Sequence, residues 1–395
     1  MPSLNLSFER LFHRKPEVIA SAPGRVNLIG EHTDYNGGYV LPTTIPQETR
    51  IELAVRQDDT VRAWSADAPA NGLPLEYRLG HEARRGQWLD YVQGITHVLA
   101  LERCALTGFD LCIESEIPAG SGLSSSAALG VSVLRALRSA FGFDLDEIRL
   151  ARLVQRSENE FVGAPVGILD PMACALGTQG EALFIDTRSL AYKRVPIPSE
   201  AELVVLDSGV SHDHAGGDYR VRRAECEQAA ALLGVAQLRD LEGVAPAAVD
   251  DFLKTLPDPY RRRARHVVTE NARVLGAVRA LRSRNLPRLG QLFYASHDSM
   301  RVDYEVSVPD IDLMVELARR DPDIYGARMT GGGFGGAVVM LAHAGTARAV
   351  GTRLAGIYSK QTGHPAALLV PREALEPVSQ ANEPTVAFHN RRTKD

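Results

Sequence analysis

One segment limits the fold more than any other: an alternating run, Phe109–Ile117, enters a glycine-containing turn and continues into an apolar helix pattern. The alternation predicts a strand. From Ser124 to Phe141 the apolar residues cover most of a helical circumference, so the pattern predicts a helix that is largely buried. The 395 residues are enough to surround such a helix, and they favour two domains over one.

A proline-containing stretch, Val195–Ser199, divides the chain into two patterns. Before it, strand-like alternation at Val18–Ile29, Gly38–Ile45 and Arg50–Arg56 predicts an antiparallel sheet. After it, a new strand pattern begins at Leu203 and the chain becomes rich in helical patterns. We therefore expect an N-terminal domain over residues 1–195 and a C-terminal domain over residues 196–395.

Composition and charge exclude several classes of protein. The formal net charge is -5 with a pI near 6.2, so no overall positive field favours nucleic acid. The four cysteines show no CxxC spacing, which predicts reduced, mostly buried thiols. The chain shows neither a secretory signal nor an uncharged apolar run long enough to span a membrane. We expect a cytoplasmic protein without nucleic-acid or membrane partners.

Glycines and serines follow the predicted strand, in the segment Gly120–Ala128. Free backbone N–H groups and the helix dipole at such a position suit a phosphate group. Small side chains also let a nucleotide approach the backbone closely. Taken alone, however, the segment is more often an ordinary strand-to-helix turn with a serine N-cap.

Two further segments carry unusual residues. Pro23–Gly38 places an arginine, a histidine, two asparagines and two carboxylates between apolar strand residues, and paired carboxylates suit sugar hydroxyls. An exposed polar hairpin is the alternative. Gly331–Gly336 has five glycines in six positions, which allows a backbone path that side chains would block. By itself it is more often a flexible hairpin.

Together and in this order, the three segments resemble the signature motifs of the GHMP kinases, and Pro23–Gly38 is similar to the galactokinase signature nearly residue for residue. The resemblance implies a two-lobed α+β GHMP kinase fold with the active site in the cleft between the lobes. It also implies ATP-dependent phosphorylation of galactose at the anomeric hydroxyl to give galactose 1-phosphate, by a monomer or weak dimer.

The same resemblance assigns roles to individual residues. Asp170 is the expected base, and Arg25 neutralises charge around the transferred phosphoryl group. Contacts with galactose are expected from Glu31, His32, Asp34, Gly167 and Tyr219. Contacts with ATP are expected from Gly120, Ser121, Gly122, Leu123, Ser124, Ser125 and Ser126, with Trp88 and Tyr91 near the adenine. Mg²⁺ is expected at Ser126 and Glu158.

Several alternatives stay open at this point. The run Leu169-Asp170-Pro171 departs from the usual Met-Asp-Gln, which leaves room for N-acetylgalactosamine, arabinose or another hexose as the substrate. Without the resemblance, Asp170 also fits a helix N-cap, and Trp88 with Tyr91 fits the core of an amphipathic helix. A sensor that binds galactose and ATP without catalysis is a further class. The cluster Glu31–Asp34 argues against mevalonate or homoserine as the substrate.

Overall fold

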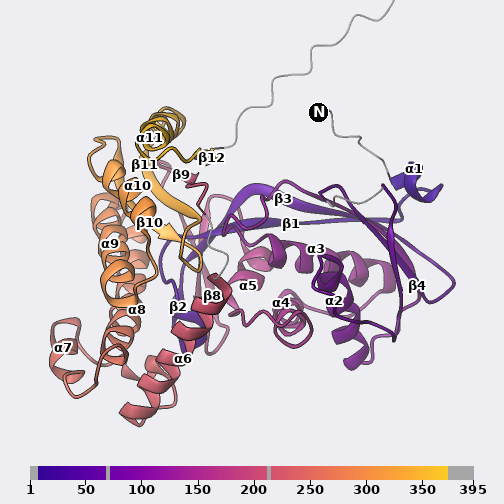
Figure 1. Cartoon of the computed structure of the whole chain (residues 1–395), viewed down its shortest axis with the longest axis horizontal. Coiled ribbons are helices and arrows are strands. Elements are labelled where there is room, and N and C mark those ends of the chain that lie inside the picture. Colours follow the sequence, from indigo (N-terminus) through magenta and orange to yellow (C-terminus); the bar gives the residue numbers. More distant parts are fainter. Residues whose placement is uncertain (1–7, 68–71, 211–214, 372–395) are drawn as a thin grey trace, which may run out of the picture.

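The computed structural model describes residues 8–67, 72–210 and 215–371, which form two sheets with helices packed against them (Figure 1). The predicted two-lobed α+β fold is confirmed. The chain passes from the first sheet to the second between Pro196 and Ala201, next to the predicted domain boundary.

The first lobe is built on a sheet with the strand order β2-β7-β3-β6-β4-β5, in which β1 also pairs with β3 and β8 with β7. Its strands are β1 (Val18–Asn27), β2 (Tyr39–Val40), β3 (Pro42–Val55), β4 (Thr60–Ser65), β5 (Leu75–Arg78), β6 (Phe109–Ser115), β7 (Glu181–Asp186) and β8 (Tyr192–Pro196). One face is covered by α2 (Leu89–Leu101), α3 (Ser125–Phe141), α4 (Glu147–Arg156) and α5 (Leu169–Leu176), while the short α1 (Phe8–Phe12) packs at the sheet's far end (Figure 1).

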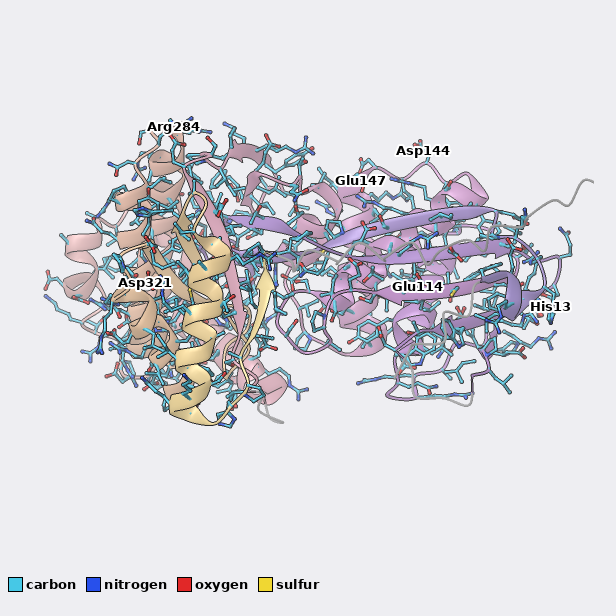
Figure 2. All side chains as sticks on the ribbon, turned by 90° about the horizontal axis from the view of Figure 1, so that it is seen from above. His13, Glu114, Asp144, Glu147, Arg284 and Asp321 are labelled. Atoms are coloured by element: carbon cyan, nitrogen blue, oxygen red, sulfur yellow. The ribbon has the colours of Figure 1, made fainter. Side chains whose placement is uncertain are left out.

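The second lobe has a four-stranded antiparallel sheet with the order β10-β11-β9-β12. Its strands are β9 (Ala201–Asp207), β10 (Ile324–Thr330), β11 (Ala337–His343) and β12 (Ala367–Val370). The helices are α6 (Ala215–Leu233), α7 (Val249–Phe252), α8 (Tyr260–Arg282), α9 (Leu286–Ser299), α10 (Pro309–Arg319) and α11 (Ala347–Thr362). Seen from above, His13 marks the far end of the first lobe, while Arg284 and Asp321 lie on the second (Figure 2).

Helix α3 is the buried helix that the sequence predicts. Its apolar residues Ala128, Val131 and Leu134 are fully buried against β1 and β3. A Cβ atom on Gly130 would lie 2.7 Å from Val154, so the glycine lets α3 and α4 approach closely. The helix ends at Gly142, whose left-handed backbone directs its N–H to the Arg138 carbonyl oxygen.

The strands differ in their bounds from the predicted patterns. Of Gly38–Ile45, residues Tyr39–Val40 form the short strand β2, while Pro42–Ile45 and Arg50–Val55 belong to the single strand β3. Pro46 lies between the two patterns, and it has no N–H group to donate to a neighbouring strand. It lies where the β1–β3 register shifts, between the Thr44 and Glu48 pairings, so the missing donor does not end the strand.

The two lobes share part of their core. Val274, Ala277 and Leu281 of α8 and Val339 of β11 belong to the same buried apolar cluster as the first-lobe helices and strands. A second cluster lies within the second lobe. All four cysteines are free thiols, three of them buried, as the sequence predicts. Among the described helices, none has the length and apolar character needed to cross a membrane.

Candidate active site

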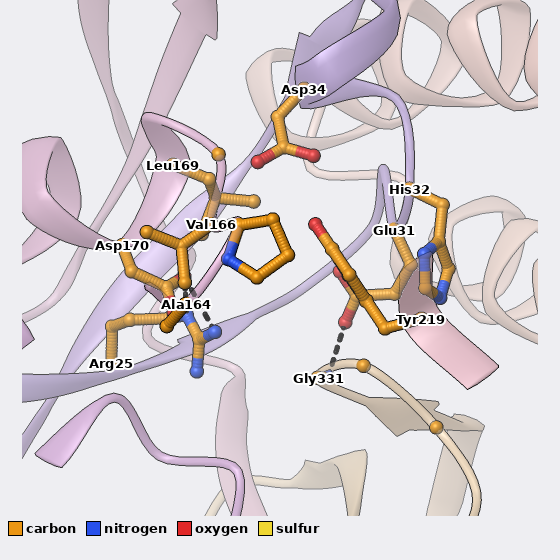
Figure 3. Close-up of a pocket in the computed structure, with 14 residues that line it drawn as sticks. Arg25, Glu31, His32, Asp34, Ala164, Val166, Leu169, Asp170, Tyr219 and Gly331 are labelled. Carbon is orange, nitrogen blue, oxygen red and sulfur yellow. Dashed lines mark hydrogen bonds and ion pairs between the residues drawn. The ribbon is translucent and has the colours of Figure 1, made fainter. Parts of the chain in front are cut away.

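A cavity of about 360 Å³ lies where the two lobes meet. The first lobe supplies Arg25 and the segment 164–170, and the second supplies Tyr219 and the glycines 331–333. All seven residues predicted for galactose contact and catalysis line this one cavity: Arg25, Glu31, His32, Asp34, Gly167, Asp170 and Tyr219. Figure 3 shows Arg25 and Asp170 on one wall, with Glu31, His32 and Tyr219 facing them.

Arg25 and Asp170 form a tight ion pair. The Nε and Nη2 atoms of Arg25 lie 2.8 Å and 2.5 Å from Oδ1 of Asp170. Oδ2 has no partner within the described residues, so this oxygen is free to accept a hydrogen bond from a ligand. Burial opposes the charge of Arg25, but Asp170 and then Glu31 outweigh it and raise the Arg25 pKa.

Asp170 is the second residue of α5, and the N-cap position belongs to Ile168. The interpretation of Asp170 as a helix N-cap is therefore wrong. Pro171 falls in the first helical turn, where backbone N–H groups have no partner within the helix. The unusual proline is thus compatible with a helical Asp170 that reaches Arg25.

Glu31 links the hairpin of the first motif to the glycine-rich third motif. Its buried carboxylate accepts a hydrogen bond from the side chain of Asn27 and another from the Gly331 N–H at 2.8 Å. The fully buried Arg328 lies 3.4 Å away. These donors hold the carboxylate in one orientation at the cavity wall.

The position of Asp34 explains why residue 167 is a glycine. A Cβ atom at position 167 would lie 1.5 Å from the Asp34 carboxylate, so no larger residue fits while Asp34 keeps its place. Burial and then the nearby charge of Asp170 raise the pKa of Asp34 to about 6. Three carboxylates, those of Glu31, Asp34 and Asp170, therefore line the cavity together with Arg25.

His32 has a left-handed backbone with a φ of 62°. Its Nδ1 atom lies 2.9 Å from the Tyr35 hydroxyl, while its buried Nε2 atom has no partner among the described residues. Burial, with the charges of His266 and Arg222, lowers its pKa to about 3, so the ring is neutral. The unused nitrogen belongs to a residue of the cavity wall.

The loop Gly120–Ser126 touches Arg25 through its backbone. The Arg25 N–H donates to the Leu123 carbonyl oxygen at 3.1 Å, and Arg25 Nη1 donates to the Gly122 oxygen at 2.6 Å. A Cβ atom on Gly331 would lie 3.4 Å from that same Gly122 oxygen. The third motif thus packs on this loop from the second lobe, as the resemblance implies.

Ser124 is not the serine N-cap that the loop by itself suggests. It occupies the N-cap position of α3, but its φ of 62° is left-handed and its hydroxyl makes no capping hydrogen bond. That hydroxyl is buried without a partner among the described residues. A strained backbone and an unused donor at a helix start are typical of a ligand loop.

A second cavity, of about 310 Å³, is lined in part by the same loop. Five of the predicted ATP contacts line it: Trp88, Tyr91, Gly120, Ser125 and Ser126. Ser121, Gly122, Leu123 and Ser124 do not line it. Leu123 is 1% exposed, so its side chain belongs to the core.

Known proteins match both the motifs and the fold. Family models match residues 6–55 (galactokinase galactose-binding signature), 90–178 (GHMP kinases N terminal domain) and 277–360 (GHMP kinases C terminal). A galactokinase of Chloroflexus aurantiacus is 43% identical over 366 residues, covering 92% of this chain and 93% of that protein. The chain belongs to the galactokinase family.

Other members of the galactokinase family agree with this. A galactokinase of Streptomyces coelicolor is 43% identical over 350 residues, covering 87% of this chain and 89% of that protein. The crystal structure of Lactococcus lactis galactokinase complexed with galactose has a TM-score of 0.86 and 32% identity, covering 91% and 95% of the two chains. A mevalonate kinase structure, with a TM-score of 0.62 and 18% identity, shares the fold.

In this galactokinase-family chain, Ser126 and Glu158 suit a hard cation. The Ser126 hydroxyl donates to Oε2 of Glu158 at 3.2 Å, and the buried Oε1 has no partner among the described residues. Burial and then the charge of Asp170 raise the Glu158 pKa to about 8. A buried carboxyl group with an unused oxygen beside a hydroxyl offers the oxygen ligands that Mg²⁺ prefers, and a cation bound there would favour its ionised form.

The sequence analysis missed the residues behind the hairpin of the first motif. Helix α8 holds this hairpin through Glu270, which accepts from the Gly30 N–H at 2.9 Å, and through Asn271, which accepts from the Tyr39 N–H at 2.8 Å. His266 adds a contact of 3.1 Å with the Glu31 carbonyl oxygen. These polar residues resemble any polar helix face, so no signal in the sequence singles them out.

Proposed function

We propose that this protein transfers the γ-phosphoryl group of ATP to the anomeric hydroxyl of galactose, giving galactose 1-phosphate and ADP. Membership of the galactokinase family supports ATP-dependent phosphorylation of galactose. The observation that carries the mechanism is the Arg25–Asp170 pair. The pair lines the cavity between the lobes, and Arg25 Nη1 also donates a hydrogen bond to the Gly122 carbonyl oxygen of the adjacent loop.

Asp170 acts as the base in a direct transfer. Its Oδ1 is occupied by Arg25, so Oδ2 accepts the proton of the attacking sugar hydroxyl. The hydroxyl oxygen bonds to the γ-phosphorus while the bond from that phosphorus to the leaving oxygen of ADP breaks. Arg25 stays positively charged and offsets negative charge around the phosphoryl group. No phosphorylated enzyme is formed.

The sugar is held by the opposite wall. Glu31 and Asp34 accept hydrogen bonds from hydroxyls, while His32 and Tyr219 offer further polar atoms beside them. Galactose has several similar hydroxyls, so placing one in line with the phosphate requires that the others be held. This cluster of acidic residues favours galactose or a close relative over a substrate with fewer hydroxyls.

Mg²⁺ would be held by Ser126 and Glu158. When bound there, the cation would supply positive charge that offsets the negative charge of the ATP phosphates. The unused Oε1 of Glu158 supports this assignment. We further propose two domains, residues 1–195 and 196–395, and a monomer or weak dimer that acts in the cytoplasm.

The test is Asp170→Asn, which keeps the shape of the side chain but removes the base. We expect kcat to fall by about 10³-fold while the dissociation constant for galactose changes less than about threefold. Asp144→Asn, an exposed acidic residue on the same lobe, is the matched control and should leave kcat unchanged. Near-normal turnover in Asp170→Asn would remove Asp170 from the role of base.

A panel of free sugars tests the substrate. Galactose should be phosphorylated with a kcat/KM at least about tenfold above that for glucose, N-acetylgalactosamine and arabinose. A preference for another sugar would reassign the substrate but keep the reaction. Tight binding of galactose and ATP without any ADP release would instead indicate a sensor.

A further inference from the structure

Three hydrogen bonds in a row lead from the sugar cavity into the second lobe. The His32 Nδ1 atom lies 2.9 Å from the Tyr35 hydroxyl, and that hydroxyl lies 2.7 Å from the Tyr304 hydroxyl. The Tyr304 hydroxyl in turn lies 3.0 Å from Sγ of Cys226. We call these four residues the relay. Only His32 lines the sugar cavity, so the other three act on a ligand through it.

Every group of the relay is neutral near pH 7. Burial lowers the pKa of His32 to about 3 and raises the pKa of Cys226 to about 11. Burial also raises the pKa values of Tyr35 and Tyr304 well above the ordinary value for tyrosine. Each hydroxyl therefore has one proton to donate, so the direction of one hydrogen bond fixes the direction of the next.

The thiol end sets that direction. A phenol O–H is a stronger donor than a thiol S–H, so Tyr304 donates to Cys226. The Tyr304 oxygen then accepts the Tyr35 hydrogen, and the Tyr35 oxygen can only accept from His32. The ring proton of His32 is thereby assigned to Nδ1.

The other end of the relay gives the same answer. The reverse direction would put the ring proton on Nε2 of His32, which is buried without a partner among the described residues. An orphaned N–H is rarer in protein interiors than an acceptor with an unused lone pair. The lack of a partner for Nε2 among the described residues therefore favours its unprotonated form.

We propose that Tyr35, Tyr304 and Cys226 are positioning residues that hold His32 as the Nδ1–H tautomer, so that Nε2 accepts a hydrogen bond from a sugar hydroxyl. The identity of the ligand rests on the proposed function, whereas the tautomer is a property of the empty protein. A hydroxyl of the sugar must then donate a hydrogen bond to His32 Nε2. A fluorine or methoxy group in place of that hydroxyl has no proton to give and binds more weakly.

The tautomer can be measured by ¹⁵N NMR on the full chain labelled at histidine, without ligands. We expect His32 to show a protonated Nδ1 and an unprotonated Nε2. Its signals are those lost in His32→Asn, since asparagine tolerates the left-handed backbone at this position. A wild-type His32 protonated at Nε2 would overturn the proposal.

Tyr304→Phe should remove the preference for the Nδ1–H tautomer, because the Tyr35 hydroxyl no longer donates to Tyr304 and can donate to His32 Nδ1 instead. Tyr77→Phe is the matched control: it removes another buried tyrosine hydroxyl, 3.0 Å from Thr96, and should leave His32 unchanged. An unchanged tautomer in Tyr304→Phe would contradict the relay. If that variant does not fold, Tyr35→Phe serves as the second variant, since it removes the acceptor of the Nδ1–H group. We expect His32 in Tyr35→Phe to lose its single tautomer. A His32 that stays protonated only at Nδ1 would contradict the relay.

Kinetics give the second readout. In Tyr304→Phe we expect the KM for galactose to rise by about five- to tenfold, with kcat and the KM for ATP within about twofold of wild type. Tyr77→Phe should leave all three constants unchanged. The two proposals fail separately: a correct tautomer without sugar kinase activity defeats only the proposed function, and activity with an Nε2–H tautomer defeats only the relay.

Discussion

At the scale of single residues, Gly167 shows how closely the sugar cavity is built. The predicted site residues could be found from the sequence because they lie in three dense motifs and in segments similar to known relatives. The reason for Gly167 could not, because Asp34 is 133 positions away in the chain and only the fold brings its carboxylate against the glycine.

Gly167→Ala should therefore damage sugar binding. The new methyl group must displace the Asp34 carboxylate, so we expect kcat/KM for galactose to fall by at least about 100-fold, with the KM for ATP little changed. Gly356→Ala is the matched control, since nothing lies within 4 Å of the added methyl group on the outer face of α11. Steady-state kinetics on both variants decide the matter, and equal kcat/KM values would mean that Asp34 does not need its present position.

Asp34 also predicts a dependence of stability on pH. Its pKa is about 6 in the folded protein against an ordinary value of 3.8, so the fold favours the protonated form. That stabilisation is complete below the unfolded pKa and is lost as the pH rises through about 6. Asp34→Asn cannot ionise, so without sugar it should melt about 2 °C above wild type near pH 8 and show a smaller difference near pH 4. Thermal melts at both pH values test this, and a variant less stable than wild type near pH 8 would contradict it.

At the scale of elements, the long strands and the buried helix followed from periodicity. The Ser124–Phe141 prediction holds almost to the residue, because a helix apolar on nearly every side leaves one interpretation. Helix α11 had no such signal: glycine, arginine and threonine break up its apolar residues, and it went unpredicted. The role of α8 was also invisible, since its partners in the hairpin lie more than 230 positions earlier.

Asn271→Ala tests whether α8 positions the hairpin. The change leaves the Tyr39 N–H without its acceptor, so we expect the free energy of unfolding to fall by about 1–3 kcal/mol. Because the hairpin carries Glu31 to Asp34, the KM for galactose should also rise several-fold. Arg279→Ala, an exposed position on the same helix, is the control. Denaturant unfolding and kinetics are the measurements, and a loss of stability without any change in KM would mean that the hairpin keeps its shape unaided.

At the scale of the whole molecule, the shared core argues for one cooperative unit. The division into two patterns near Val195–Ser199 was visible in the sequence, but the apolar contacts of α8 and β11 with the first lobe were not. Surface that is buried between two lobes must be exposed when either of them unfolds, which couples their stabilities.

Calorimetry should therefore record a single unfolding transition for the full chain, with a calorimetric enthalpy equal to the van't Hoff enthalpy. Galactose and ATP should each move that one transition upward rather than splitting it. Two separate transitions, only one of which responds to galactose, would show that the lobes unfold independently.

The bond from the Gly331 N–H to Glu31 has a consequence for redesign of this enzyme. An engineer who wants to change the accepted sugar would naturally begin with an acid that faces it. Substituting Glu31, however, would release the Gly331 backbone that packs on Gly122, so a change aimed at the sugar would also disturb the loop Gly120–Ser126, which we propose for ATP. Asp34 makes no bond to that backbone among the described residues, and the wall formed by Asp34 and Gly167 is the better place to begin.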